Sequence, residues 1–172
     1  MKNIFLFLFF TLAISASVDA QSKKEQKKAK ALEEFEATKK LVESENFEFQ
    51  ADWATPTSGR RVSLTTNPNF LKYSKDSVDI YLPYFGQITG GGASMTGDGG
   101  IVCNGPRSKY KMTVDDKKQK IIIDFEVSNK DDTFKFNMQI YKSGSTFINV
   151  NSNFRNSISY DGKIKIPQPE NN

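Results

Sequence analysis

The sequence has no histidine and only one cysteine, Cys103, in 172 residues. Histidine is the side chain that most often serves acid–base catalysis at neutral pH, so its absence disfavours the common hydrolase mechanisms. A single cysteine cannot form an internal disulfide, and no histidine or second cysteine is present to activate its thiol. Stability must come from burial, and about 150 residues after removal of a leader can bury roughly two thirds of their surface.

Strong charge of one sign is also missing. The net charge is +4, the lysines are scattered among acids, and no arginine-rich stripe is present. A nucleic-acid footprint concentrates positive charge on one face or one helix. The pattern therefore indicates a solvated surface, and we expect no nucleic-acid partner.

The long hydrophobic run is confined to the first twenty residues. Lys2 precedes an apolar stretch from Ile4 to Ile14, and Val18-Asp19-Ala20 offers a small-residue cleavage site. This order predicts a signal peptide over residues 1–20; an uncleaved membrane anchor is disfavoured because the run is too short to span a bilayer. No cysteine follows that could carry a lipid. We expect a soluble, exported protein, periplasmic or extracellular, without a stable membrane anchor.

Residues 21–46 favour a helix, since they are rich in Lys, Glu and Ala and lack Pro and Gly. Leu32, Phe35 and Val42 recur at helical spacing and form one apolar stripe. We expect this helix to lie across a sheet; a helix that binds a partner or a membrane surface is the alternative.

Residues 47–166 show alternating apolar and polar positions, most regularly in three runs between Lys118 and Ser152 joined by short polar turns. This period of two predicts antiparallel strands with one buried face. The whole region predicts roughly eight to nine short strands, and closure would remove the exposed sheet edges. We therefore expect a mainly β fold, an antiparallel lipocalin-like β-barrel flanked by the N-terminal helix. A two-sheet β-sandwich is the alternative, and residues 167–172 should form a flexible tail.

Three local patterns refine this prediction. Trp53 shares the parity of Phe47, Phe49 and Ala51, which places all four on one face of a strand. Asp161-Gly162 reads as a tight turn between two short strands. The dense glycines between Gly86 and Gly105 predict a mobile surface loop.

No motif for a cofactor, a metal ion or catalysis is found. The glycine loop matches neither a P-loop nor a dinucleotide fingerprint, because it leads into a proline and a strand. Asp98-Gly99-Gly100 is too short for a calcium loop. The adjacent carboxylates Asp115-Asp116 and Asp131-Asp132 occupy hairpin tips, where aspartate is favoured for turn hydrogen bonds.

Aromatic residues directly before the glycine loop are the best candidates for a binding site. Tyr81, Tyr84 and Phe85 precede it, and Arg155 and Tyr160 could complete a barrel mouth. Aromatic rings beside mobile backbone suit the rim of a ligand cavity. The alternative is that these side chains plug the barrel end and anchor the loop.

Several short strings carry a resemblance to a known family: Ser77-Val78, Tyr81-Leu82-Pro83-Tyr84-Phe85-Gly86, Ser152-Asn153-Phe154-Arg155-Asn156, Ile158-Ser159-Tyr160-Asp161-Gly162, Trp53, Pro56 and Gly59-Arg60-Arg61. They resemble a Bacteroidota family of exported proteins described only as a domain of unknown function, over residues 35–166. The resemblance implies a periplasmic or envelope location and a lipocalin-like β-barrel. It implies no activity, cofactor or catalytic residue.

Three functional hypotheses follow. The first is non-catalytic binding of an apolar or amphiphilic ligand, or of an envelope component, at one barrel end, with the glycine loop as a lid. The second is a structural or protein-interaction module of the envelope that uses the helix or an open strand edge. The third, an enzyme built on carboxylates, requires acids that converge in a polar cleft.

Overall fold

The computed structural model describes residues 2–57, 59–89, 99–130 and 132–167, with side chains from residue 23 onward. It divides into two units, residues 1–34 and residues 35–172. Helix α1 (Lys2–Glu43) contains most of the predicted helix and begins earlier in the chain. Its last turns belong to the second unit, where Phe35 and Val42 are buried and Thr38 Oγ1 donates to the Lys142 carbonyl at 2.7 Å. Within the described chain, no helix is long and apolar enough to cross a membrane.

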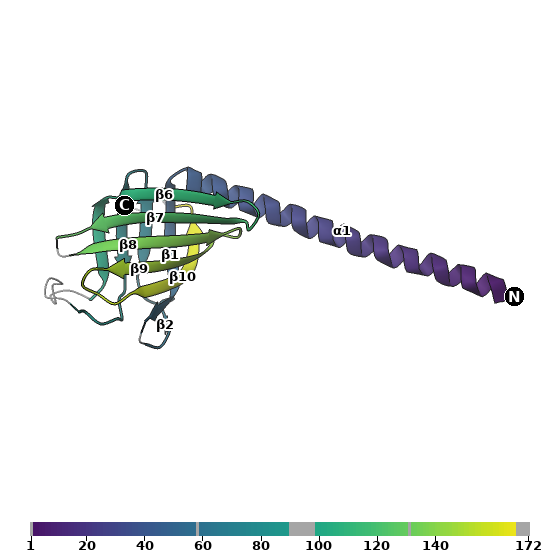
Figure 1. Ribbon diagram of the computed structural model, residues 1–172, viewed down its shortest axis with the longest axis horizontal. Coiled ribbons are helices and arrows are strands. Elements are labelled where there is room, and N and C mark those ends of the chain that lie inside the picture. The colour runs from purple at the N-terminus through teal and green to yellow at the C-terminus, as the bar shows by residue number, and fades with distance from the viewer. Residues whose placement is uncertain (1, 58, 90–98, 131, 168–172) are drawn as a thin grey trace. The chain divides into compact units, whose positions relative to one another are not determined.

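The second unit is a sheet of antiparallel strands that curves into a nearly closed barrel (Figure 1). Its order is β5-β4-β3-β1-β10-β9-β8-β7-β6, and β2 pairs with β1 outside this path. The mainly β barrel expected from the alternating pattern is confirmed. The strands are β1 (Asn46–Pro56), β2 (Val62–Ser63), β3 (Phe70–Ser74), β4 (Ser77–Leu82), β5 (Ile101–Pro106), β6 (Ser108–Asp115), β7 (Lys120–Ser128), β8 (Thr133–Tyr141), β9 (Ser145–Ser152) and β10 (Ile158–Lys165).

The two ends of the sheet order are consecutive in the chain, because only Arg107 separates β5 from β6. The stretch 101–115 therefore pairs with β4 through its first half and with β7 through its second half. Gly105 (φ 150°) and Lys109 (φ 50°) both have positive φ at this bend. Asn129 Nδ2 adds a hydrogen bond of 3.0 Å to the Val102 carbonyl across the seam.

Arg107 holds the bend in place. Its Nη2 lies 2.9 Å from Glu45 Oε1, and its Nε donates to the Lys75 carbonyl at 2.7 Å. The guanidinium also stacks over the Tyr110 ring at 3.7 Å and the Tyr73 ring at 5.0 Å. Burial, followed by the nearby Tyr110, raises the pKa of Tyr73 above its ordinary value. The Tyr73 hydroxyl therefore stays protonated inside the barrel.

Aromatic rings occupy the barrel interior. Phe125 stacks on Phe136 at 4.9 Å between centroids, and Phe47 stacks on Tyr73 at 4.8 Å. Tyr73 meets Phe125 edge to face at 5.8 Å, which joins the two stacks. Each buried phenylalanine contributes about 1.5–3 kcal/mol to folding. The region that a lipocalin-like ligand would enter is thus lined by rings that already contact each other.

The structure corrects the predicted orientation of Trp53. Phe47, Phe49 and Ala51 are buried as expected, but Trp53 is 38% exposed. The register of β1 against β10 shifts between Ala51 and Trp53, which marks a β-bulge and moves Trp53 to the outer face. A bulge of this kind cannot be read from parity, because it depends on the partner strand.

The predicted turn at Asp161-Gly162 is also wrong, since both residues lie within the continuous strand β10. The glycine is needed for close approach: a Cβ at Gly162 would lie 2.0 Å from the Gln50 carbonyl oxygen on β1. The predicted loop from Gly86 to Gly105 is shorter than expected, because Ile101–Pro106 forms β5.

Candidate functional site

Three of the five predicted mouth residues meet at one end of the barrel: Tyr84, Arg155 and Tyr160. The Arg155 guanidinium lies 5.2 Å from the centroid of the Tyr84 ring. Arg155 Nη1 donates to the Gly99 carbonyl at 3.2 Å and to the Gly100 carbonyl at 3.1 Å. Arg155 therefore ties the chain that leads into β5 to the end of the barrel.

Asp132 lies against Arg155 and was not among the predicted binding residues. Arg155 Nε is 3.8 Å from Asp132 Oδ2, and the two side chains are only 9% and 1% exposed. Asp132 also accepts the Thr133 amide at 2.8 Å, the Asn153 amide at 3.3 Å and the Ser152 hydroxyl. Asp132 lies in the turn between β7 and β8 and accepts the Thr133 amide there, as expected for an aspartate at a hairpin tip; what the sequence did not indicate is its burial with a counterion. Asp131 lies outside the described residues.

The two tyrosine hydroxyls of this end face backbone carbonyls. Tyr160 donates to the Pro83 carbonyl at 2.8 Å. The Tyr84 hydroxyl is 2.9 Å from both the Gln87 and the Asn156 carbonyl oxygens, and donates to one at a time. Burial raises the pKa of Tyr160, and burial raises that of Tyr84 against the opposing effect of Arg155. Both hydroxyls thus hold the chain's own backbone.

The other two predicted mouth residues lie apart from this cluster. Tyr81 is on the outer surface beside Phe70, with ring centroids 6.2 Å apart. Phe85 is 43% exposed, and Ile88, three residues later in the chain, is 39% exposed. Ligand contact by any of the five stays a prediction. Residues 90–98 of the proposed lid lie outside the described residues.

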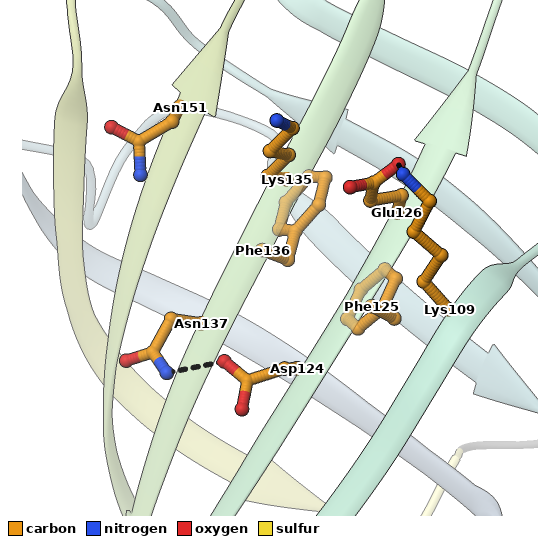
Figure 2. Close-up of a pocket in the computed structure, with 8 residues that line it drawn as sticks. All are labelled: Lys109, Asp124, Phe125, Glu126, Lys135, Phe136, Asn137 and Asn151. Atoms are coloured by element: carbon orange, nitrogen blue, oxygen red, sulfur yellow. Dashed lines mark hydrogen bonds and ion pairs between the residues drawn. The ribbon is translucent and has the colours of Figure 1, made fainter.

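One hollow on the outer face of the sheet is lined mainly by polar side chains, and it was not predicted from the sequence. This polar hollow has a volume of about 260 Å³. Figure 2 shows Asp124 and Asn137 pointing toward each other, and Lys109 reaching Glu126. Asn137 Nδ2 donates to Asp124 Oδ1 at 2.6 Å, and Lys109 Nζ lies 2.9 Å from Glu126 Oε2. Its lining is Lys109, Asp124, Phe125, Glu126, Lys135, Phe136, Asn137 and Asn151.

Hydrogen bonds between outward side chains extend from this hollow in both directions along the sheet. Gln139 Nε2 donates to Asn137 Oδ1 at 3.3 Å on β8. Asn151 Nδ2 donates to Asn149 Oδ1 at 2.8 Å on β9, and Ser157 donates to Asn151 Oδ1 at 2.6 Å. Asn137 and Asn149 are direct cross-strand partners. The polar positions of the period-two pattern were visible in the sequence, and their Asn content was the signal that could have been used.

A second hollow of about 280 Å³ lies on the outer face near the β1 bulge. Two exposed rings line this aromatic hollow, Trp53 at 38% and Tyr141 at 42% exposure. The Arg61 guanidinium lies 4.7 Å from the Trp53 ring centroid, and Arg61 Nη2 is 3.1 Å from Asp161 Oδ2. The other lining residues are Asp52, Ser145, Thr146, Phe147, Gly162 and Lys163.

The arrangement of these residues suits binding more than chemistry. In the described chain, no group of three or more His, Cys, Asp or Glu side chains is placed to hold a metal ion. Burial, followed by the nearby Asp132, raises the pKa of Cys103 to about 12, so the thiol stays protonated at neutral pH. The side chains of both hollows can still offer fixed donors, acceptors and ring faces to a ligand.

Comparison with known proteins agrees with this fold. A search of curated proteins finds no match. A crystal structure at 1.95 Å of a DUF4251 family protein from Bacteroides eggerthii DSM 20697 is similar, with a TM-score of 0.59 and 17% identity, over 76% of this chain and 86% of that chain. At that identity the similarity concerns the fold alone. The family model described as a domain of unknown function, DUF4251, matches residues 29–164. The chain therefore belongs to the DUF4251 family.

Proposed function

We propose that this chain is an exported, non-catalytic binding domain of the cell envelope that binds through the outer face of β7, β8, β9, β10 and β1. The observation that carries this proposal is the network of Asn and Asp side chains on that face. Export rests on the leader pattern of residues 1–20, and the lack of catalysis rests on the absence of histidine.

Asparagine and aspartate are depleted in strands, because they pack poorly on a pleated surface and favour turns. Yet Asp124, Asn137, Asn149, Asn151 and Asp161 occupy outward positions in the middle of this sheet. Stability alone would favour threonine or valine there. Asn and Asp side chains grouped in one patch of a sheet are expected where these side chains contact a ligand.

The mutual hydrogen bonds also reduce the cost of binding. Gln139, Asn137 and Asp124 hold one another, as do Ser157, Asn151 and Asn149. An immobilised side chain otherwise costs about 0.5–1.5 kcal/mol of entropy when it is ordered at an interface. A pre-ordered face loses less of this energy on binding.

Co-sedimentation with purified envelope fractions tests the proposal. The full chain should be retained, and the double variant Asn137→Ala/Asn149→Ala should bind about tenfold or more weakly, since each lost hydrogen bond costs about 1 kcal/mol. The matched control is Asp79→Ala/Asn104→Ala, an outward cross-strand pair on β4 and β5. Equal retention of both double variants, or no retention of the parent chain, would refute the assignment.

A second candidate function is the binding of an amphiphile at the barrel mouth. The observation that favours it is the pair of exposed apolar side chains Phe85 and Ile88, with Ile88 bridged to Arg155. An alkyl chain could cover these two side chains while its polar head stays in water, because the Arg155 guanidinium is buried against Asp132. A fluorescent fatty acid should bind the parent chain and lose affinity in Phe85→Ser/Ile88→Ser; unchanged affinity would contradict this candidate.

A further inference from the structure

We infer that the ligand of the outer face is a segment of a neutral polysaccharide, held by the polar hollow and the aromatic hollow together. This inference rests on the proposed function and specifies its ligand. It depends on three independent properties of the two hollows: their balance of charge, their exposed rings and their continuity across the sheet.

The charge balance favours a neutral ligand. The polar hollow is lined by two acids, Asp124 and Glu126, and two bases, Lys109 and Lys135. The aromatic hollow is likewise lined by two acids, Asp52 and Asp161, and two bases, Arg61 and Lys163. Each hollow therefore has no formal net charge. A nucleic acid or a polyphosphate would need a clear excess of positive charge.

The exposed rings provide a stacking surface. Sugar rings present patches of C–H groups on one face and hydroxyls around the edge, so they match an aromatic ring flanked by polar side chains. Trp53 and Tyr141 combine an apolar ring with a polar tip. The Arg61 guanidinium lies over the Trp53 ring, 4.7 Å from its centroid, and pairs with Asp161; it is half exposed, so a sugar ring can take its place on the indole. The β1 bulge turns Trp53 outward, away from a core that would bury it.

The two hollows are joined by the register of the sheet. Asn137 and Asn149 pair across β8 and β9, and the next outward pair on the same strands is Gln139 and Phe147. Phe147 pairs with Asp161, which pairs with Trp53. With strands about 4.8 Å apart, the four steps from β7 to β1 span about 19 Å. That length suits an oligomer better than a single sugar.

A peptide is a poorer fit for this face. Peptides commonly bind sheets by adding a strand to a free edge. In the described barrel, β7, β8, β9, β10 and β1 are each paired on both sides, so they offer no such edge along this face. A lipid is also disfavoured, because an ion pair lies at each hollow and amide side chains line the polar hollow.

The single tryptophan of the chain makes the inference directly measurable, because all indole emission comes from Trp53. The full chain is titrated with dextran, mannan, laminarin and polysaccharide extracted from the envelope of the encoding organism, with heparin as the anionic comparison. A saturable change in emission is expected for at least one neutral polysaccharide. No change with any of them, or a change with heparin alone, overturns the inference.

Variants then locate the contact by affinity electrophoresis. Trp53→Ala is expected to weaken binding at least tenfold, and Asn149→Ala about threefold to tenfold. Val102→Ala shortens an exposed apolar side chain on β5 that lines neither hollow, and it should stay within twofold of the parent chain. Equal effects of Trp53→Ala and Val102→Ala would overturn the placement on the outer face.

Treatment of the envelope fraction separates failure of this inference from failure of the proposed function. Periodate cleaves the vicinal diols of sugars and should abolish retention of the chain, whereas protease treatment should leave it intact. Retention lost only after protease treatment identifies a protein partner: the glycan inference is then wrong, while the envelope-binding function stands. No retention by the untreated fraction refutes both.

Discussion

Replacement of Arg155 by alanine is expected to destabilise the barrel unit by about 3–5 kcal/mol. The guanidinium is buried beside Asp132, and its removal leaves that carboxylate without a counterion in a site where the side chain is 1% exposed. Two hydrogen bonds to the Gly99 and Gly100 carbonyls are lost as well. Three donors from Thr133, Ser152 and Asn153 remain on Asp132, which keeps the cost within that range.

An exposed arginine of the same barrel supplies the matched control. Arg61 pairs with Asp161 at 3.1 Å, but the two side chains are 52% and 44% exposed. Solvent screens such a pair, so Arg61→Ala should cost no more than about 1 kcal/mol. The two variants thus remove the same side chain from a buried and from an exposed ion pair.

Urea unfolding followed by far-UV circular dichroism measures both free energies of unfolding. We expect the midpoint of Arg155→Ala to fall well below that of Arg61→Ala at an unchanged denaturant slope. Equal destabilisation by the two substitutions would refute the argument that Arg155 plugs the barrel end. It would also favour the alternative, in which Arg155 is kept for a ligand.

Two further predictions concern buried polar groups. Asn69 accepts a hydrogen bond from the Ala51 amide and donates one to the Ala51 carbonyl, so it takes the place of a strand partner at the bulge. Asn69→Ala should therefore lower the free energy of unfolding by about 2–4 kcal/mol in a urea titration. A loss below about 1 kcal/mol would contradict this role. Stability should be complete below about pH 8 and fall as the pH rises, since burial raises the pKa of Cys103, Tyr73 and Tyr160 in the folded state. Near pH 11 these three groups are ionised in the unfolded chain and still largely protonated in the folded one, so the loss should be about 4 kcal/mol per pH unit. A difference of fewer than one bound proton between the folded and unfolded states would show that these groups are solvated.

The pattern of inward side chains was readable from the sequence because it depends on local periodicity. Ile121, Ile123, Phe125 and Val127 alternate with positions that are polar except for Ile122, and each of the four is buried. The same reasoning identified the strands on either side of the turn at Lys142-Ser143-Gly144. Side chains alternate between the two faces of a strand whichever strands lie next to it, so a period of two predicts which residues are buried without knowledge of the neighbouring strands.

The sites depend on contacts that no local pattern contains. Arg155 and Asp132 were each visible, but their pairing requires β8 and the chain after β9 to meet at the same barrel end. Tyr84 and Tyr160 were correctly placed together, yet only the structure showed that their hydroxyls hold the chain's own carbonyls. Polarity marks a residue as a candidate for contact but does not specify what it contacts.

Local patterns in the chain were enough to predict the class of fold and the buried face of most strands, and its composition offers no histidine for acid–base chemistry. Tertiary structure alone decided how the sheet closes, because the continuous stretch through Arg107 pairs with β4 on one side and β7 on the other. It also decided which face Trp53 presents, because the bulge in β1 requires the close approach of Gly162 on β10. Both features depend on the pairing of β1 with β10, which lie far apart in the chain and join the two halves of the sheet. Such pairing is a property that local periodicity does not carry.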